Sequence, residues 1–128
     1  MATLSEVMRT DFITVAPEDT LGEVAEQMTA LDVGSVVVKD FGTLIGILTE
    51  RDLLKAMAAR VHSSEARVRQ FMTVGPVTAA PEMDCGDAEQ LMLDKGFRHL
   101  PIVDGDDVLG VVSLRRVVAA TKIAAASS

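Results

Sequence analysis

Two pairs of polar residues have the types and the spacing that ligand binding requires. Thr49 stands three residues before Asp52, and Arg98 is followed directly by His99. A threonine hydroxyl at a helix start can meet a phosphate oxygen beside free N–H groups, and a carboxylate can accept hydrogen bonds from ligand hydroxyls. Arginine holds phosphate with charge-assisted donors, and histidine adds a donor whose charge depends on pH. Thr-x-x-Asp is equally a helix cap that needs no ligand, so both interpretations stay open at this point.

The other reactive side chains give little support for catalysis or metal binding. The sequence has no P-loop, no paired catalytic acid and base, and no Cys/His pairing at a recognisable spacing. His99 has no cysteines or second histidine nearby, so we expect no metal site. The acidic turn of residues 104–107 is typical of a solvated hairpin tip, and Cys85 lies on an expected buried helix stripe. We therefore expect that the chain is not an enzyme.

Composition limits the partners and the compartment. The formal net charge of −7 opposes non-specific binding to nucleic acid or to an anionic membrane. No apolar run is long enough to span a bilayer, and the first residues lack the hydrophobic stretch of a signal peptide. A single cysteine excludes an internal disulfide and fits a reducing compartment. We expect a cytoplasmic protein, and the hydrophobic content of 48% leaves surface to bury in an oligomer.

An internal repeat organises the whole chain. The two halves match without gaps at a constant offset of 64 residues, as Met8 and Met72 or Gly46 and Gly110 illustrate. Each half alone would have only a marginal core, so we expect the halves to bury surface against each other. The repeat predicts one small domain over residues 1–62 and a second over 63–128, with residues 124–128 as a fraying, disordered tail.

Each half is predicted to fold as β-α-β-β-α, an α/β (α+β) class. Extended segments precede prolines, Thr20 with Glu23 forms a capping box, and two β-rich runs with a turn between them predict a hairpin. The expected ranges are 12–16, 21–31, 34–38, 43–48 and 50–60 in the first half, and 76–80, a helix with its apolar stripe over 85–92, 100–103, 108–112 and 114–124 in the second. In the helix over 50–60 we expect Leu53, Leu54 and Met57 to be buried.

These features together resemble a tandem pair of cystathionine-β-synthase (CBS) domains. The phrase Gly46-Ile-Leu-Thr-Glu-Arg-Asp-Leu53 resembles the Gly-h-h-Thr-x-x-Asp signature that closes a CBS repeat, where h is apolar. Phe97-Arg-His-Leu-Pro-Ile-Val103 resembles the opening of the middle strand of a second repeat. The resemblance covers about residues 4–122, and we expect a stand-alone CBS pair with no other domain attached. It implies two repeats packed about a pseudo-twofold axis and a disc-shaped homodimer.

The resemblance also implies a regulatory role and two clefts between the repeats. CBS pairs bind adenosyl ligands such as AMP, ADP, ATP or S-adenosylmethionine there and modulate a partner. Cleft one would contain Thr49, Asp52, Val77, Thr78, Phe97, Arg98, His99 and Pro101. Cleft two would contain Thr14, Gly34, Ser35, Ser113 and Arg116. In cleft two Arg116 occupies the aspartate position, and a guanidinium cannot accept from ribose hydroxyls, so we expect one strong site per chain.

Three functions are compatible with the sequence. The first is a ligand-sensing regulatory module with no tightly bound cofactor, in which an adenosyl ligand acts as effector on an unknown regulated protein. The second is a structural or partner-docking CBS pair without a nucleotide, in which Thr49 and Asp52 only cap a helix. The third, with the least support, is an enzyme acting on a nucleotide.

Overall fold

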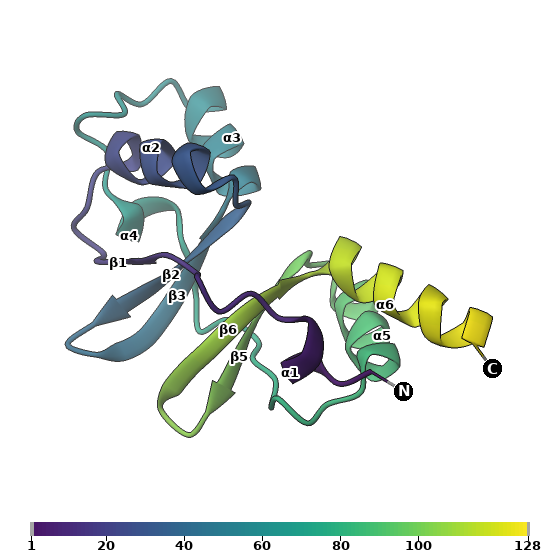
Figure 1. Ribbon diagram of the computed structural model, residues 1–128. Helices are drawn as coiled ribbons and strands as arrows, with labels where there is room; N and C mark the ends of the chain where they lie inside the picture. Colours follow the sequence, from purple (N-terminus) through teal and green to yellow (C-terminus); the bar gives the residue numbers. More distant parts are fainter. Residues whose placement is uncertain (1, 128) are drawn as a thin grey trace. The chain divides into compact units, whose positions relative to one another are not determined.

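The computed structural model describes residues 2–127, with side chains to residue 126, as two compact units. One unit is Phe12–Pro76, and the other combines the chain up to Asp11 with the chain from Val77 onward. The elements of the first unit are β1 (Thr14–Val15), α2 (Leu21–Leu31), β2 (Ser35–Asp40), β3 (Thr43–Thr49), α3 (Glu50–Ala58), α4 (Val68–Phe71) and β4 (Thr73–Val74). Those of the second are α1 (Leu4–Val7), α5 (Cys85–Lys95), β5 (His99–Asp104), β6 (Asp107–Ser113) and α6 (Leu114–Ser127) (Figure 1). The predicted mixed α/β class is confirmed.

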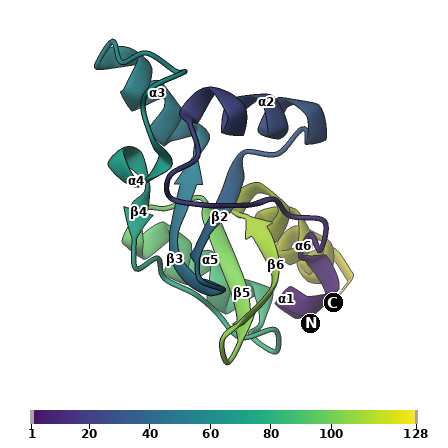
Figure 2. The same ribbon diagram turned by 90° about the vertical axis from the view of Figure 1, so that its left-hand side faces the viewer.

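An antiparallel hairpin forms the centre of each unit. In the first unit β2 and β3 pair with Ser35 opposite Thr49. Strand β1 adds parallel to β2, and β4 adds antiparallel to β3, beside which it lies in Figure 2. In the second unit β5 and β6 pair with His99 opposite Ser113. The 64-residue sequence repeat is therefore also a repeat of strand register.

A short lead segment at the start of each repeat docks on the hairpin unit of the other repeat. Residues 2–9 belong to the first repeat, yet the Leu4 N–H donates to the Met83 carbonyl at 2.9 Å in the unit of β5 and β6. Residues 66–73 follow the same rule in the other unit, where the Val68 N–H donates to the Asp19 carbonyl at 2.9 Å. The boundaries of the compact units therefore differ from those of the sequence repeats, 1–62 and 63–128. That each repeat is a separate domain stays a prediction.

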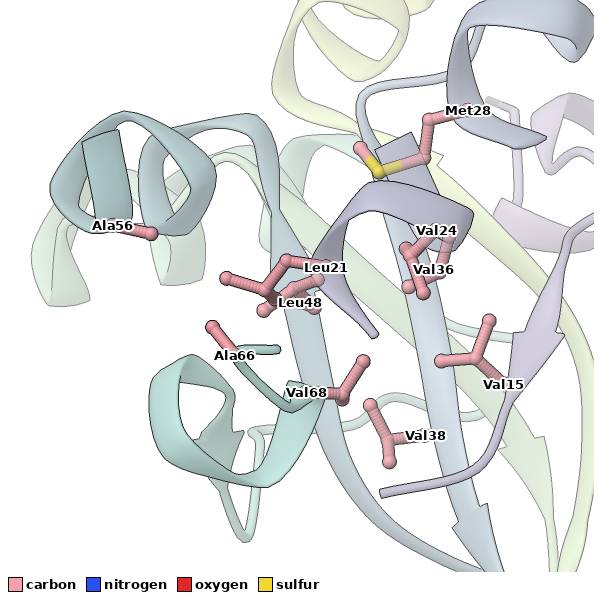
Figure 3. Packing of buried hydrophobic residues seen from close by; sticks show 10 residues of the cluster. All are labelled: Val15, Leu21, Val24, Met28, Val36, Val38, Leu48, Ala56, Ala66 and Val68. Carbon is pink, nitrogen blue, oxygen red and sulfur yellow. The ribbon is translucent and has the colours of Figure 1, made fainter. Parts of the chain in front are cut away.

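Each unit has its own hydrophobic core on the helix side of its hairpin. The first core contains Val15, Leu21, Val24, Met28, Val36, Val38, Leu48, Ala56, Ala66 and Val68 (Figure 3). The second contains Leu4, Ala79, Cys85, Ala88, Met92, Leu100, Ile102, Val112 and Val117. Both cores include the lead segment of the other repeat, through Ala66 and Val68 in the first core and Leu4 in the second. Cys85 is a core residue as predicted, and burial raises the pKa of its thiol.

Helix α3 faces the core with a different side from the predicted one. Asp52 and Ala56 are buried and Leu53 packs against the core, whereas Leu54 is 67% exposed and Met57 is 75% exposed. The prediction that Leu54 and Met57 are buried is wrong. The carboxylate of Asp52 is held at the helix start by hydrogen bonds to Thr49, described below, and this fixes which side of the helix turns inward. Two large apolar side chains therefore remain on the surface.

The last helix extends further than the sequence analysis expects. Helix α6 runs from Leu114 to Ser127, whereas the predicted helix ends near Ala124 and is followed by a fraying tail. Alanine has the highest intrinsic helix propensity, and three consecutive alanines, residues 124–126, allow the helix to continue. Ser128 lies outside the described residues.

The hairpin tip of the first repeat contains a fully exposed aromatic residue in a left-handed backbone conformation. Phe41 has φ +51° and an exposed ring, while the matching residue of the second repeat is Gly105 at φ +60°. A non-glycine residue in this region destabilises the folded state by about 1–2 kcal/mol. Replacement by glycine removes this strain, but the larger conformational entropy of glycine in the unfolded state offsets part of the gain. We expect Phe41→Gly to raise the free energy of unfolding by about 1 kcal/mol, measured by urea denaturation.

The matching control is Gly105→Ala. No atom lies within 4 Å of a Cβ built on Gly105, so the substitution changes only the backbone preference, and we expect it to lower the free energy of unfolding by about 1 kcal/mol. A loss of stability in Phe41→Gly would contradict the prediction, because it would require a stabilising contact of the exposed ring.

Candidate functional site

The junction of β3 and α3 holds the Thr-x-x-Asp pair. Thr49 is the last residue of β3 and the N-cap of α3. One carboxylate oxygen of Asp52, Oδ2, accepts from the Thr49 backbone N–H at 2.9 Å and from the Thr49 hydroxyl at 3.2 Å. Asp52 is only 7% exposed. The pair therefore caps α3, as the helix-cap interpretation of the Thr-x-x-Asp spacing predicts.

The second oxygen of the same carboxylate has a different environment. Both hydrogen bonds to Asp52 end on Oδ2, and among residues 2–126 no donor is recorded for Oδ1. No buried, unpartnered side-chain oxygen or nitrogen occurs in that same range, so Oδ1 retains some access to solvent. A carboxylate oxygen can accept two hydrogen bonds. Helix capping thus uses half of the carboxylate and leaves the other half able to bind a ligand hydroxyl.

The start of β2 lies directly beside this junction. Ser35 is the ladder partner of Thr49, and the Gly34 carbonyl accepts from the Glu50 N–H at 3.0 Å. Ser35 is 7% exposed, and Thr14 on the neighbouring strand β1 is exposed. Within the first unit the structure therefore brings Thr49, assigned to cleft one, next to Gly34 and Ser35, assigned to cleft two. Antiparallel pairing causes this, because the start of one hairpin strand always meets the end of the other.

The equivalent junction in the second unit is rich in cations. Ser113 caps α6 by accepting from the Arg116 N–H at 3.2 Å, and His99 is the ladder partner of Ser113. The Arg98 carbonyl accepts from the Leu114 N–H at 2.8 Å. The side chains of Arg98 and Arg116 are both exposed, and His99 is half-buried. A junction with this many donors suits an anionic group. The guanidinium of Arg116 cannot accept hydrogen bonds from ligand hydroxyls.

Pro101 weakens the strand that should contain Val77 and Thr78. In the first repeat the Val37 N–H donates to the Ile13 carbonyl at 3.0 Å and ties β1 to β2. Pro101 occupies the position of Val37 in the second repeat and has no N–H. The expected strand over 76–80 is therefore wrong: only a bridge between Ala79 and Ile102 forms. Sequence reasoning missed this consequence, although a proline inside a strand is a signal for it.

Val77 and Thr78 lie on the surface, as Thr14, the repeat equivalent of Thr78, does in the first unit. Val77 is 37% exposed and Thr78 is exposed, while Pro101 is buried. Phe97, also assigned to cleft one, is half-buried and packs against the core of the second unit. Thr49 and Asp52 lie in one compact unit, and the other six residues assigned to cleft one lie in the other. That they form one site stays a prediction.

No group of three or more His, Cys, Asp or Glu side chains among the described residues is arranged to hold a metal ion. The acidic turn at Asp104, Asp106 and Asp107 is exposed at the hairpin tip. No helix in the described part of the chain is long and apolar enough to cross a membrane.

Comparisons with known proteins agree on one family. The family model of the CBS domain matches twice, over residues 4–59 and 68–122. The CBS domain-containing protein YhcV of Bacillus subtilis is 35% identical over 114 residues, which cover 89% of this chain and 81% of YhcV. Both comparisons indicate the CBS domain family.

Solved structures match over nearly the whole chain. The CBS-domain containing protein ATU1752 from Agrobacterium tumefaciens has a TM-score of 0.86 and 31% identity, covering 94% of this chain and 99% of that one. The CBS domain pair of protein MJ0100, solved in complex with 5′-methylthioadenosine and S-adenosyl-L-methionine, has a TM-score of 0.84. Its identity is 21%, over 95% of this chain and 97% of that one, so this likeness concerns the fold alone.

Proposed function

Because this chain belongs to the CBS domain family, with two CBS domains in tandem, we propose that it is a regulatory module that senses an adenosyl ligand. The observation that carries the proposal is the state of Asp52, which is 7% exposed and whose carboxylate has one oxygen in the helix cap and one without a recorded partner among the described residues. In the proposed function Oδ1 accepts from the ribose hydroxyls of AMP, ADP, ATP or S-adenosylmethionine. The ligand-bound MJ0100 pair supports this ligand class.

The remaining residues of cleft one have complementary tasks in this proposal. In this proposal the Thr49 hydroxyl turns its one hydrogen from Asp52 Oδ2 to a phosphate or carboxylate of the ligand, beside N–H groups at the start of α3 other than that of Glu50, which donates to the Gly34 carbonyl. The exposed guanidinium of Arg98 and the imidazole of His99 add donors for the same anionic groups. Val77, Thr78, Phe97 and Pro101 supply the apolar and backbone surroundings of the adenine. Ligand binding then joins residues of two compact units.

The proposal assigns one strong site to each chain. In cleft two, formed by Thr14, Gly34, Ser35, Ser113 and Arg116, the position equivalent to Asp52 is an exposed arginine. A guanidinium has donors only, so the ribose contact available at Asp52 has no counterpart there. We propose that cleft two is empty or binds weakly.

Regulation in this scheme follows from a shift between arrangements of the protein. A ligand regulates only if it binds two arrangements with different affinity, and we propose that a homodimer provides these arrangements and acts on a separate regulated protein. In this scheme the chain binds its effector and does not catalyse a reaction. The cytoplasm is the proposed compartment, since the one cysteine is an unpaired, buried thiol.

A second function is supported by a specific observation. The Thr49–Asp52 pair makes a complete local contact as a helix cap, so a structural or partner-docking CBS pair would also need these two residues. The two functions differ in one measurable respect. Only the sensing module gains stability from an adenosyl ligand.

A thermal-shift panel of AMP, ADP, ATP, S-adenosylmethionine, NAD and cyclic di-AMP separates the two functions. A ligand that binds only the folded state stabilises it by about 2.7 kcal/mol at 100 times its Kd, which corresponds to a Tm increase of roughly 10 °C for a domain of this size. We expect at least one adenosyl ligand to give such a shift and Asp52→Ala to abolish it. Arg116→Ala should retain the shift.

Asp52→Ala also removes a helix cap, so it needs a matched control. Thr20 caps α2 in the same unit and accepts from the Glu23 N–H at 3.3 Å, and we expect Thr20→Ala to lower the free energy of unfolding by a similar amount, about 1 kcal/mol. Thr20→Ala should keep the full ligand shift. If no ligand changes the Tm, the partner-docking function is the better one; if Asp52→Ala keeps the shift, the assignment of cleft one is wrong.

A further inference from the structure

Two methionines pack the lead segments against glycines of the central hairpins. Met8 lies in the lead segment of the first repeat, and Met72 lies in that of the second. A Cβ built on Gly110 would lie 2.8 Å from the Met8 sulfur, and one built on Gly46 would lie 2.9 Å from the Met72 sulfur. In each unit the thioether therefore occupies the space that a side chain of the strand would otherwise fill. Because the offset of 64 residues relates the two contacts, the chain contains the same thioether–glycine contact twice.

The lead segments depend on contacts of this kind to stay in place. Their helices, α1 and α4, have four residues each and are too short to be stable by themselves. Beside Met8 the backbone of Arg9 exchanges hydrogen bonds of 2.9 and 3.0 Å with Val111. Each lead segment in turn contributes a fully buried side chain to a core, Leu4 in the second unit and Val68 in the first. Loss of a thioether contact would therefore affect the core of its unit.

The methionines of the chain differ in their access to solvent. Met8 and Met72 are half-buried at the margins of the two cores. Met28 and Met92 are inside the cores, 5% and 0% exposed, whereas Met57 is 75% exposed on α3. Because peroxide oxidises the thioethers that solvent reaches, it has access to the first pair and is excluded from the second. At Met57 an oxidised side chain simply remains in water.

We propose that Met8 and Met72 form a reversible switch that releases the lead segments in the presence of peroxide. In the reaction the sulfur attacks one oxygen of hydrogen peroxide and the O–O bond breaks. The thioether is oxidised to a sulfoxide, and the peroxide is reduced to water. Keeping the polar S–O group inside an apolar contact is unfavourable, so the oxidised side chain moves into solvent and the lead segment leaves its unit. Sulfoxide reductases reverse the oxidation.

Peroxide treatment of the full, ligand-free chain tests the proposal. Peptide mass spectrometry should find sulfoxide first at Met57, next at Met8 and Met72, and last at Met28 and Met92. We expect the urea midpoint of unfolding to stay constant while only Met57 is oxidised. It should fall by at least about 0.5 M once Met8 and Met72 are oxidised. Methionine sulfoxide reductases of both stereospecificities should restore it.

Leucine variants identify the sulfurs that carry the effect. The double variant Met8→Leu, Met72→Leu keeps an apolar side chain of similar volume without a thioether, and its urea midpoint should change by less than about 0.2 M under peroxide. It retains the other methionines, among them the half-buried Met83, so any effect of their oxidation persists in it. Met57→Leu is the matched control and should lose stability under peroxide as the unchanged protein does.

Three results would overturn the proposal. One is an unchanged midpoint after complete oxidation of Met8 and Met72, and another is a loss of stability that persists in the double variant. The third is resistance of Met8 and Met72 to peroxide equal to that of the two buried methionines. Because every measurement uses ligand-free protein, these results and the thermal-shift result for the adenosyl ligand are independent of each other.

Discussion

Replacing Leu4 by alanine is expected to lower the free energy of unfolding by about 3 kcal/mol, although this residue is the fourth in the chain. Leu4 is fully buried and belongs to the core formed with Met92, Ile102 and Val117. Leu→Ala substitutions in cores cost about 2–5 kcal/mol, because the lost transfer free energy is added to the cost of a cavity. The first residues of most domains tolerate such changes, so a large effect here tests the docking of the lead segment. The chain has no Trp or Tyr, so urea unfolding is followed by far-UV circular dichroism.

Two further variants determine whether the loss comes from burial. Ser5 is exposed and adjacent to Leu4, and Ser5→Ala should change the free energy of unfolding by less than about 0.5 kcal/mol. Val68 is the repeat equivalent of Leu4 and is fully buried in the other core, so Val68→Ala should cost about 2 kcal/mol. A Leu4→Ala chain as stable as the unchanged protein would mean that the lead segment is not docked in solution.

The elements set by local patterns could be predicted from the sequence. Helix α2 has an apolar stripe at helical spacing and a capping residue, Thr20, and both hairpins have two β-rich runs around a turn. The lead segments could not be predicted, because α1 and α4 have four residues each and β4 has two. Segments this short contain no hydrophobic period, and hydrogen bonds to residues far away in the chain hold them in place.

The residue types of the candidate site could be predicted from the sequence, but their orientation and their neighbours only in part. The spacing of Thr49 and Asp52 predicts a cap, and the structure contains it. The same cap turns α3 so that Leu54 is exposed, which a count of apolar positions cannot anticipate because it gives no weight to a buried carboxylate. Ser35 lies beside Thr49 through strand register, whereas the resemblance to CBS pairs assigns these residues to different clefts.

Gly110→Ala is expected to be the other strongly destabilising change, with a loss of about 3 kcal/mol. A Cβ at this position would lie 2.7 Å from the Arg9 carbonyl oxygen and 2.8 Å from the Met8 sulfur. The backbone oxygen has little freedom to move, because Arg9 and Val111 exchange two hydrogen bonds of 2.9 and 3.0 Å. Overpacking costs about 1–3 kcal/mol, and displacement of the lead segment removes two hydrogen bonds worth about 1 kcal/mol each.

The sign of the effect makes the Gly110 prediction decisive. Gly→Ala inside a strand without a steric conflict stabilises by about 0.5–1 kcal/mol, so an unobstructed site would give the opposite result. Gly46 is the repeat equivalent, where a Cβ would lie 2.9 Å from the Thr73 carbonyl oxygen, and Gly46→Ala should be destabilising for the same reason. Amide exchange identifies the location: Gly110→Ala should speed exchange at Arg9 and leave Thr73 protected, and Gly46→Ala should do the reverse. If either variant is more stable than the unchanged protein, the close approach of its lead segment to the strand is wrong, because the added methyl group would then have met no obstacle.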